Sequence, residues 1–185
     1  MSRDLLLWAV EHLTKADIPH MLAGSFASTH HGSPRTTHDI DLIIDPFAGS
    51  IERFIAGVDH TDFYVDDPTV RDEVRRRGMF GILDLRSGWK LDLIVIKDRD
   101  FSRSEFRRRL AVRVLGVDVH VATAEDIVLA KLEWALKGGS ARQLDDVVAV
   151  LAVRSDAIDN DYLDHWAPEL GVGDLLQIVR DRLAR

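Results

Sequence analysis

The sequence MLAGSFASTHHGSPRTTHDIDLIID, which runs from Met21 to Asp45, decides the predicted fold of this chain. It begins with a short apolar run into Gly24 and Ser25, continues through a polar segment, and ends in an alternating run that carries Asp39 and Asp41. The pattern predicts a strand, a turn built from small residues, and a second strand that presents two carboxylates.

Asp39 and Asp41 are expected on one face of the second strand, because side chains alternate between the two faces of a strand. Two carboxylates side by side repel each other unless they share a cation. Since carboxylate oxygens are hard ligands and the chain contains no cysteine, Mg²⁺ or Mn²⁺ is favoured over zinc. The simpler alternative is a solvent-facing strand, although aspartate is depleted in strands.

Gly24 and Ser25 complement these acids. A glycine lets the backbone approach a ligand closely, and a helix that begins at Ser25 would direct free N–H groups at an anion. A phosphate site beside a metal site suggests nucleotide chemistry.

Length and composition limit the classes of protein to which this chain can belong. With 185 residues, the chain is long enough for one domain with a substantial core. The absence of cysteine excludes disulfides, iron–sulfur clusters and thiolate zinc sites. No apolar run approaches membrane-spanning length and the N-terminus does not resemble a signal peptide, so we expect a cytoplasmic protein that has no membrane partner.

The net charge of −7 argues against a protein that binds nucleic acid over its whole surface. Two arginine runs, at 75–77 and 107–109, are local exceptions. Such runs can hold a phosphate backbone, or they can form solvated helix faces beside acidic neighbours. Both interpretations remain open at this point.

Apolar periodicity and turn residues predict the other elements. A first strand is expected near 20–23 and a hairpin across 115–116. Helices are expected at 4–15, 50–58, 69–77, 101–109 and 124–137, from 140 onward, and in two segments of 159–185. Thr123 and Ser140 are predicted to cap the two helices that follow them.

A further predicted hairpin, with a two-residue turn at 87–88, contains a candidate third acid. Such a turn pairs Leu83 with Asp92, so Asp84 and Asp92 lie on opposite faces of the hairpin. Only one of the two can therefore join the acid pair of the earlier strand.

The spacing of Gly-Ser, thirteen intervening residues and Asp-x-Asp resembles the signature of the DNA polymerase β-type nucleotidyltransferase superfamily. Arg35, Thr37 and the segment EDIVLAKLEWALKGGSARQLDD at 125–146 are similar to the smaller bacterial branch of AbiEii-like and MenT-like toxins. The resemblance covers roughly residues 21–150.

This resemblance implies an α/β (α+β) fold, in which a nucleotidyltransferase-like mixed β-sheet is flanked by helices and followed by a C-terminal helical bundle. It implies a catalytic core at 1–121 and a helical region at 122–185, packed as a single compact unit. The implied activity is Mg²⁺-dependent transfer of a nucleoside monophosphate from an NTP to an acceptor hydroxyl, with release of pyrophosphate.

The resemblance also assigns roles to the acids and to the small-residue turn. Asp39 and Asp41 would hold Mg²⁺ or Mn²⁺, and Asp92, as the family's third carboxylate, would bind a second metal or act as the base. The backbone of Gly24 and Ser25 would hold the β- and γ-phosphates.

Cationic side chains complete the implied site. Arg35 and Lys131 would place positive charge on the nucleotide phosphates, with Asp145 or Asp146 on the following helix beside Lys131. Lys131 interrupts an otherwise apolar helical run, and the bland alternative is a lysine on the exposed stripe of an amphipathic helix.

The acceptor has several candidates. By resemblance it is a tRNA, with a cognate antitoxin protein as partner, or a small hydroxylated molecule such as an aminoglycoside, or a protein side chain. Two other functions remain open: a catalytically silent fold that acts as a binding module or toxin–antitoxin partner, and a metal-dependent phosphodiesterase. The phosphodiesterase would use the same acids together with His30, His31 and His38.

Overall fold

The computed structural model describes residues 2–34 and 36–184. Its strands are β1 (His20–Leu22), β2 (Asp39–Ile44), β3 (Phe63–Tyr64), β4 (Met79–Asp84), β5 (Lys90–Val95), β6 (Leu110–Val114) and β7 (Val117–Val121). Within this described part, the strands form one seven-stranded sheet in the order β3-β4-β5-β2-β1-β7-β6. The sheet is mixed, because β2 runs parallel to β5 and β1 parallel to β7, whereas β1 and β2 are antiparallel.

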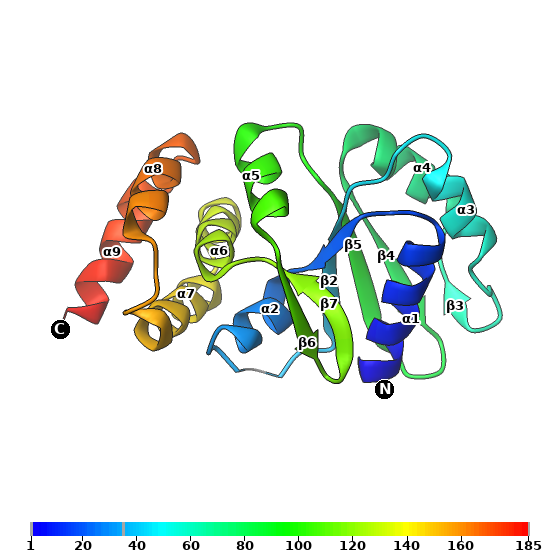
Figure 1. Ribbon diagram of the computed structural model, residues 1–185, viewed down its shortest axis with the longest axis horizontal. Helices are drawn as coiled ribbons and strands as arrows, with labels where there is room; N and C mark the ends of the chain where they lie inside the picture. Colours follow the sequence, from blue (N-terminus) through cyan, green and yellow to red (C-terminus); the bar gives the residue numbers. More distant parts are fainter. Residues whose placement is uncertain (1, 35, 185) are drawn as a thin grey trace.

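The helices are α1 (Ser2–Lys15), α2 (Gly24–His30), α3 (Ser50–Ala56), α4 (Asp67–Arg76), α5 (Asp100–Arg108), α6 (Ala124–Gly138), α7 (Ala141–Arg154), α8 (Asn160–Glu169) and α9 (Gly173–Leu183). Figure 1 shows α1, α3 and α4 on one side of the sheet and α6 to α9 gathered on the other. This confirms the predicted class, a mixed α/β sheet flanked by helices and followed by C-terminal helices.

The central strand β2 separates two environments. Ile40, Leu42 and Ile44 are fully buried and belong to one hydrophobic cluster with Leu6 of α1 and Phe54 of α3. The alternate residues of β2, which include both acids, point to the opposite face. That face looks toward α6 and carries the candidate site.

A second hydrophobic cluster holds α6 to α9 together and includes Val128, Val147, Leu163 and Val179. It also takes in Phe101 of α5, which precedes the sheet's last two strands in the chain. Since Phe101 of α5 belongs to this cluster and Arg108 of α5 forms an ion pair with Glu125 of α6, the two helices lie together and form the roof over the acidic face of the sheet.

The predicted register of the β4–β5 hairpin was wrong. Leu83 pairs with Lys90, and Gly81 rather than Leu83 lies opposite Asp92. The physical reason is the Asp84 carboxylate, which accepts hydrogen bonds from the backbone N–H of Arg86 and from the hydroxyl of Ser87 and so closes a longer turn. Because the slip is two residues and side chains alternate with a period of two, each residue keeps its face.

One of the two predicted capping residues, Thr123, caps its helix and the other does not. Thr123 caps α6 by accepting a hydrogen bond from the N–H of Asp126, and α6 ends before Gly139, which has a φ of 60°. Ser140 occupies the expected position before α7 but makes no capping bond through its side chain, so that prediction was wrong. Within residues 2–34 and 36–184, none of the helices is both long and apolar enough to cross a membrane.

Candidate active site

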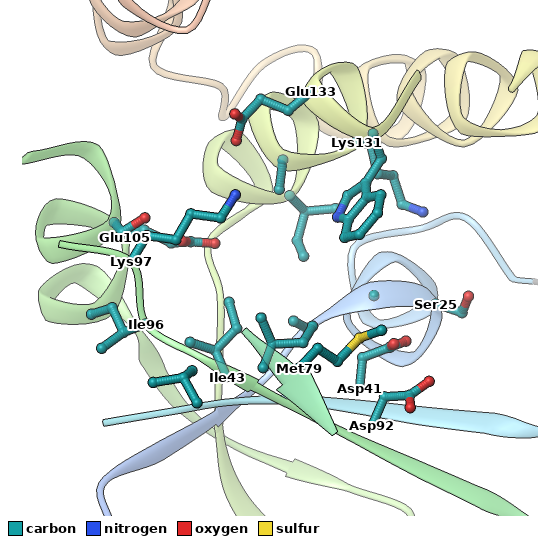
Figure 2. A pocket seen from close by; sticks show the side chains of 18 of the residues that line it. Ser25, Asp41, Ile43, Met79, Asp92, Ile96, Lys97, Glu105, Lys131 and Glu133 are labelled. Carbon is teal, nitrogen blue, oxygen red and sulfur yellow. The ribbon is translucent and has the colours of Figure 1, made fainter. Parts of the chain in front are cut away.

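A pocket of about 330 Å³ lies between the acidic face of the sheet, α2, α5 and α6. Figure 2 shows Asp41, Asp92 and Ser25 around one end of this pocket and Lys97, Glu105 and Glu133 around the other. The strands supply the floor and α6 supplies the roof. Side chains from residues 23 to 143 therefore meet in one cavity.

Asp41 and Asp92 lie side by side at the first end. The parallel strands β2 and β5 place them directly opposite each other in register, and both line the pocket. Asp39 also lines the pocket, but it is exposed and lies opposite Lys90. Of the two candidate acids in the hairpin, Asp92 therefore joins the pair and Asp84 does not.

Negative charge is concentrated at Asp41. Burial raises the pKa of this carboxyl, and the charges of Asp92 and Asp39 raise it further. The N–H of Ser25 and the charge of Lys131 act in the opposite direction without cancelling the effect. Under-neutralised carboxylates in a pocket are the environment in which a bound cation is favourable.

Lys90 supplies part of the missing positive charge. Its Nζ lies 2.8 Å from Oδ1 of Asp92, and this contact raises the pKa of the lysine. Lys90 is about half exposed, so its ammonium can leave the carboxylate at low cost. The Asp92 oxygen is itself buried.

The oxygen donors suit a hard divalent ion, although a complete cage is not preassembled. Within residues 2–34 and 36–184, no three Asp, Glu, His or Cys side chains are arranged to enclose a metal. Mg²⁺ does not require such a cage, because it usually keeps several waters and binds one or two carboxylates together with substrate phosphates. Asp41 and Asp92 fit that mode, with Asp39 at the entrance.

Gly24 is required where the turn meets the acid strand. Its φ is +56°, and a Cβ at this position would lie 1.9 Å from Oδ2 of Asp41. The N–H of Ala23 donates to the backbone carbonyl of Asp41 at 2.9 Å, which fixes the two segments together. α2 begins at Gly24, one residue before the predicted start. The Gly-Ser and Asp-x-Asp motifs are thus in direct contact.

Lys131 faces inward, so the exposed-stripe interpretation was wrong. Its Nζ is buried and donates to Oδ2 of Asp146 at 2.7 Å and to Oε1 of Gln143 at 3.0 Å. The alternative partner Asp145 is exposed and lies near Arg182 instead. Asp146 also accepts a hydrogen bond from Ser33, which ties the lysine to the segment after α2.

The remaining residues that the sequence placed in the site are an arginine, a threonine and the histidines. Arg35 lies outside the described residues. Thr37 lines the pocket, and its Oγ1 accepts a hydrogen bond from the N–H of Asp39 at 3.3 Å. Nε2 of His31 is 2.7 Å from the carbonyl of Ala122, so this histidine has a structural partner. In the part of the chain that the structure describes, no histidine joins the acids in a metal-binding arrangement.

The arginine runs have partners within the chain. Arg75 and Arg76 contact the acids one turn earlier on α4. Arg108 forms an ion pair with Glu125 at 3.0 Å and stacks on Tyr162. These contacts favour the solvated helix-face interpretation over a phosphate-backbone site.

Sequence reasoning missed the second end of the pocket, above all Glu105. This residue is buried on α5, and burial, followed by the charge of Asp126, raises the pKa of its carboxyl to about 8. The signal was present in the sequence, because Glu105 falls on the same buried stripe as Phe101 and Phe106. An acid on the apolar side of an amphipathic helix departs from the usual pattern and is therefore informative.

Comparisons with protein-family models and with curated proteins find no match to this sequence. Solved structures are similar in fold. An antigenic nucleotidyltransferase-like protein from Paracoccidioides brasiliensis is 15% identical over 80% of this chain and 74% of that chain, with a TM-score of 0.51.

Two further structures give lower scores. The antibiotic-resistance factor ANT(2'')-Ia is 13% identical over 99% of this chain and 94% of that chain, with a TM-score of 0.49. The lincosamide antibiotic adenylyltransferase LnuA is 11% identical over 80% of this chain and 95% of that chain, with a TM-score of 0.45. On the first of these comparisons, the chain has a nucleotidyltransferase-like fold.

Proposed function

We propose that this chain is a nucleotidyltransferase, which moves a nucleoside monophosphate from an NTP to an acceptor hydroxyl. One observation carries the proposal: Asp41 and Asp92 lie in register on one face of a pocket, against the Gly24–Ser25 turn and near the ammonium of Lys131. A carboxylate pair, a close backbone turn and a buried cation are the three elements that a metal–triphosphate complex needs.

The triphosphate would lie between the Gly24–Ser25 turn and Lys131. An ammonium has three N–H donors, and Asp146 and Gln143 use two of those on Lys131. The third remains for a phosphate oxygen while Asp146 holds the lysine in place. Arg35 is proposed as a second source of positive charge on the phosphates.

Mg²⁺ or Mn²⁺ would be held by Asp41 and Asp92, with Asp39 at the entrance, and would neutralise charge on the α-phosphate. In the transfer step, the acceptor oxygen forms a bond to the α-phosphorus and the bond from that phosphorus to the bridging oxygen breaks, so pyrophosphate leaves. In the alternative arrangement, in which Asp39 rather than Asp92 completes the metal site with Asp41, Asp92 would instead take the proton from the acceptor hydroxyl.

The toxin hypothesis names tRNA as the acceptor and a cognate antitoxin as the partner. The net charge of −7 and the internal partners of Arg75, Arg76 and Arg108 favour a small hydroxylated acceptor over a large polyanion. We therefore place the small acceptor first and tRNA second.

The test is incubation with α-³²P-labelled NTPs and Mg²⁺ or Mn²⁺, with total tRNA or a set of aminoglycosides as acceptors. Transfer of label by the wild type and by Asp45→Asn, but not by Asp41→Asn, is expected. Asp45 is the matched control, because it is exposed and directly follows the same strand.

Two results would contradict transferase activity. Metal-dependent NTP binding with no transfer to any acceptor would favour the silent binding module. Release of nucleoside monophosphates from RNA, with no pyrophosphate formed from NTPs, would favour the phosphodiesterase.

A further inference from the structure

The pocket continues beyond the acid pair into a second region, which we name the inner lobe. It follows β2 and β5 away from Asp41 and Asp92 and ends beneath α5 and α6 (Figure 2). At this end Figure 2 shows Ile43, Ile96, Lys97, Glu105 and Glu133, and Trp134 of α6 lines the same pocket. No part of the proposed phosphate and metal chemistry uses them.

The length of the lobe matches a nucleoside. Asp92 and Ile96 are four residues apart along one extended segment, which corresponds to roughly 13 Å. This is comparable to the length of a nucleoside monophosphate from its phosphate to the far edge of its base. A nucleotide with its phosphates at Asp41 and Asp92 would therefore extend its base to the far end of the lobe.

The middle of the lobe is apolar, which suits a flat ring. Ile43 and Ile96 lie on the floor. Trp134 lines the same pocket from α6, one turn beyond Lys131, and 53% of it is exposed. An aromatic side chain at such a position offers a face for base stacking, which contributes strongly to nucleotide binding.

Glu105 provides a polar group at the end of the lobe. Only 5% of the residue is exposed, and its carboxyl makes no hydrogen bond or ion pair among the described residues. The nearby cation Arg99 is already committed to Glu133 through two hydrogen bonds, of 2.8 and 2.5 Å. A buried acid without a partner is costly, so a ligand that supplies one gains affinity.

The surroundings of Glu105 favour its neutral form at pH 7. Asp126 adds negative charge from α6, Glu133 adds more, and the opposing charges of Arg99 and Lys97 do not outweigh burial. A neutral carboxyl presents one O–H donor beside one carbonyl acceptor. The amide of glutamine presents the same pair and binds adenine through its N6 and N7 atoms.

We propose that the inner lobe binds the base of the nucleoside triphosphate, with Glu105 hydrogen-bonded to the polar edge of the base and Trp134 stacked on its face. This inference rests on the proposed function, because it assumes that the phosphates lie at Asp41 and Asp92. Glu105 and Trp134 are then specificity residues, separate from the groups that hold the metal and the phosphates.

The test compares two ligands, ATP and inorganic tripolyphosphate, each titrated calorimetrically with Mg²⁺. Tripolyphosphate carries the phosphates without a base, so the wild type should bind ATP about tenfold more tightly or better. Trp134→Ala and Glu105→Leu should each weaken ATP binding at least about fivefold while tripolyphosphate binding stays within about twofold.

Two variants sharpen the comparison. Glu105→Gln should keep the affinity for ATP, because its amide reproduces the donor and acceptor of the neutral acid. Leu136→Ala is the matched control for Trp134→Ala, since Leu136 is an exposed apolar residue of α6 that does not line the pocket. It should bind both ligands as the wild type does. Trp134 is half exposed, so its variant should fold even if Glu105→Leu does not.

Three outcomes would overturn the inference, and they are distinguishable. Equal affinity of the wild type for ATP and tripolyphosphate would be compatible with the proposed function, but it would show that the inner lobe does not bind the base. If Trp134→Ala bound ATP as the wild type does but had a raised KM for the acceptor, the inner lobe would bind the acceptor and not the base. Binding of neither ligand by the wild type would overturn the proposed function as well.

Discussion

Replacing Glu105 by glutamine should stabilise the protein, and by more at pH 7 than at pH 5. In the folded chain, burial and the charge of Asp126 raise the pKa of this carboxyl from 4.5 to about 8. The folded state therefore binds a proton that the unfolded state releases above pH 4.5. Stability from this group is fully present below that pH and is lost as the pH rises toward 8.

The size of the effect follows from the distance of the pH from the unfolded pKa. At pH 7 the folded chain must protonate Glu105 at a cost on the order of 3 kcal/mol, whereas at pH 5 the cost is below about 1 kcal/mol. Glutamine is always neutral and avoids this cost. The gain at pH 7 corresponds to a rise in Tm of roughly 6–12 °C for a chain of this size.

Urea unfolding followed by circular dichroism at pH 5 and pH 7 measures the difference directly. Glu169→Gln is the control, because Glu169 is exposed on α8 and its replacement should change the free energy of unfolding by less than about 0.5 kcal/mol at either pH. An equal gain for Glu105→Gln at both pH values, or a loss at both, would refute the explanation by burial.

Three further substitutions test the first end of the pocket. Asp41→Asn removes a carboxyl whose pKa is raised by burial and by Asp92, so differential scanning fluorimetry without metal should show a higher Tm than the wild type, and Mg²⁺-dependent ATP binding should be lost. A lower Tm would count against charge repulsion at this site. Gly24→Ala puts a methyl group against Asp41 at a positive φ, so urea unfolding should show a loss of about 1–3 kcal/mol; wild-type stability would contradict the close approach. Lys131→Met leaves the buried charge of Asp146 without its counter-ion and should cost about 3–5 kcal/mol, of which Lys131→Met/Asp146→Leu should recover a large part. Strictly additive effects would show that the two residues are not coupled.

The sequence predicted the first end of the pocket because local rules decide it. Alternation along one strand places Asp39 and Asp41 on one face, and the same rule separates Asp84 from Asp92. The error in the predicted hairpin register did not affect the site, since a shift of two residues leaves each side chain on the same face of the sheet. The choice of Asp92 came from the family resemblance, and the parallel pairing of β2 with β5 supplies its geometry.

The second end could not be read in the same way because it depends on contacts between distant segments. Glu105 lies in the pocket only because α5 packs against α6, and no periodicity predicts which helix covers a sheet. The pairing of Lys131 with Asp146 rather than Asp145 also depends on how α7 is rotated against α6. Periodicity gives the faces of elements, and tertiary packing decides which faces meet.

A crystal structure with Mn²⁺ and a non-hydrolysable ATP analogue tests the central claim most directly, because the anomalous signal of Mn²⁺ locates the ion without assumptions. We predict an ion within about 2.0–2.4 Å of carboxylate oxygens of Asp41 and Asp92, with Lys90 displaced and the triphosphate between the Gly24–Ser25 turn and Lys131. An ion or nucleotide bound elsewhere, with Lys90 still paired to Asp92, would contradict the claim that this pocket is a nucleotidyltransferase site.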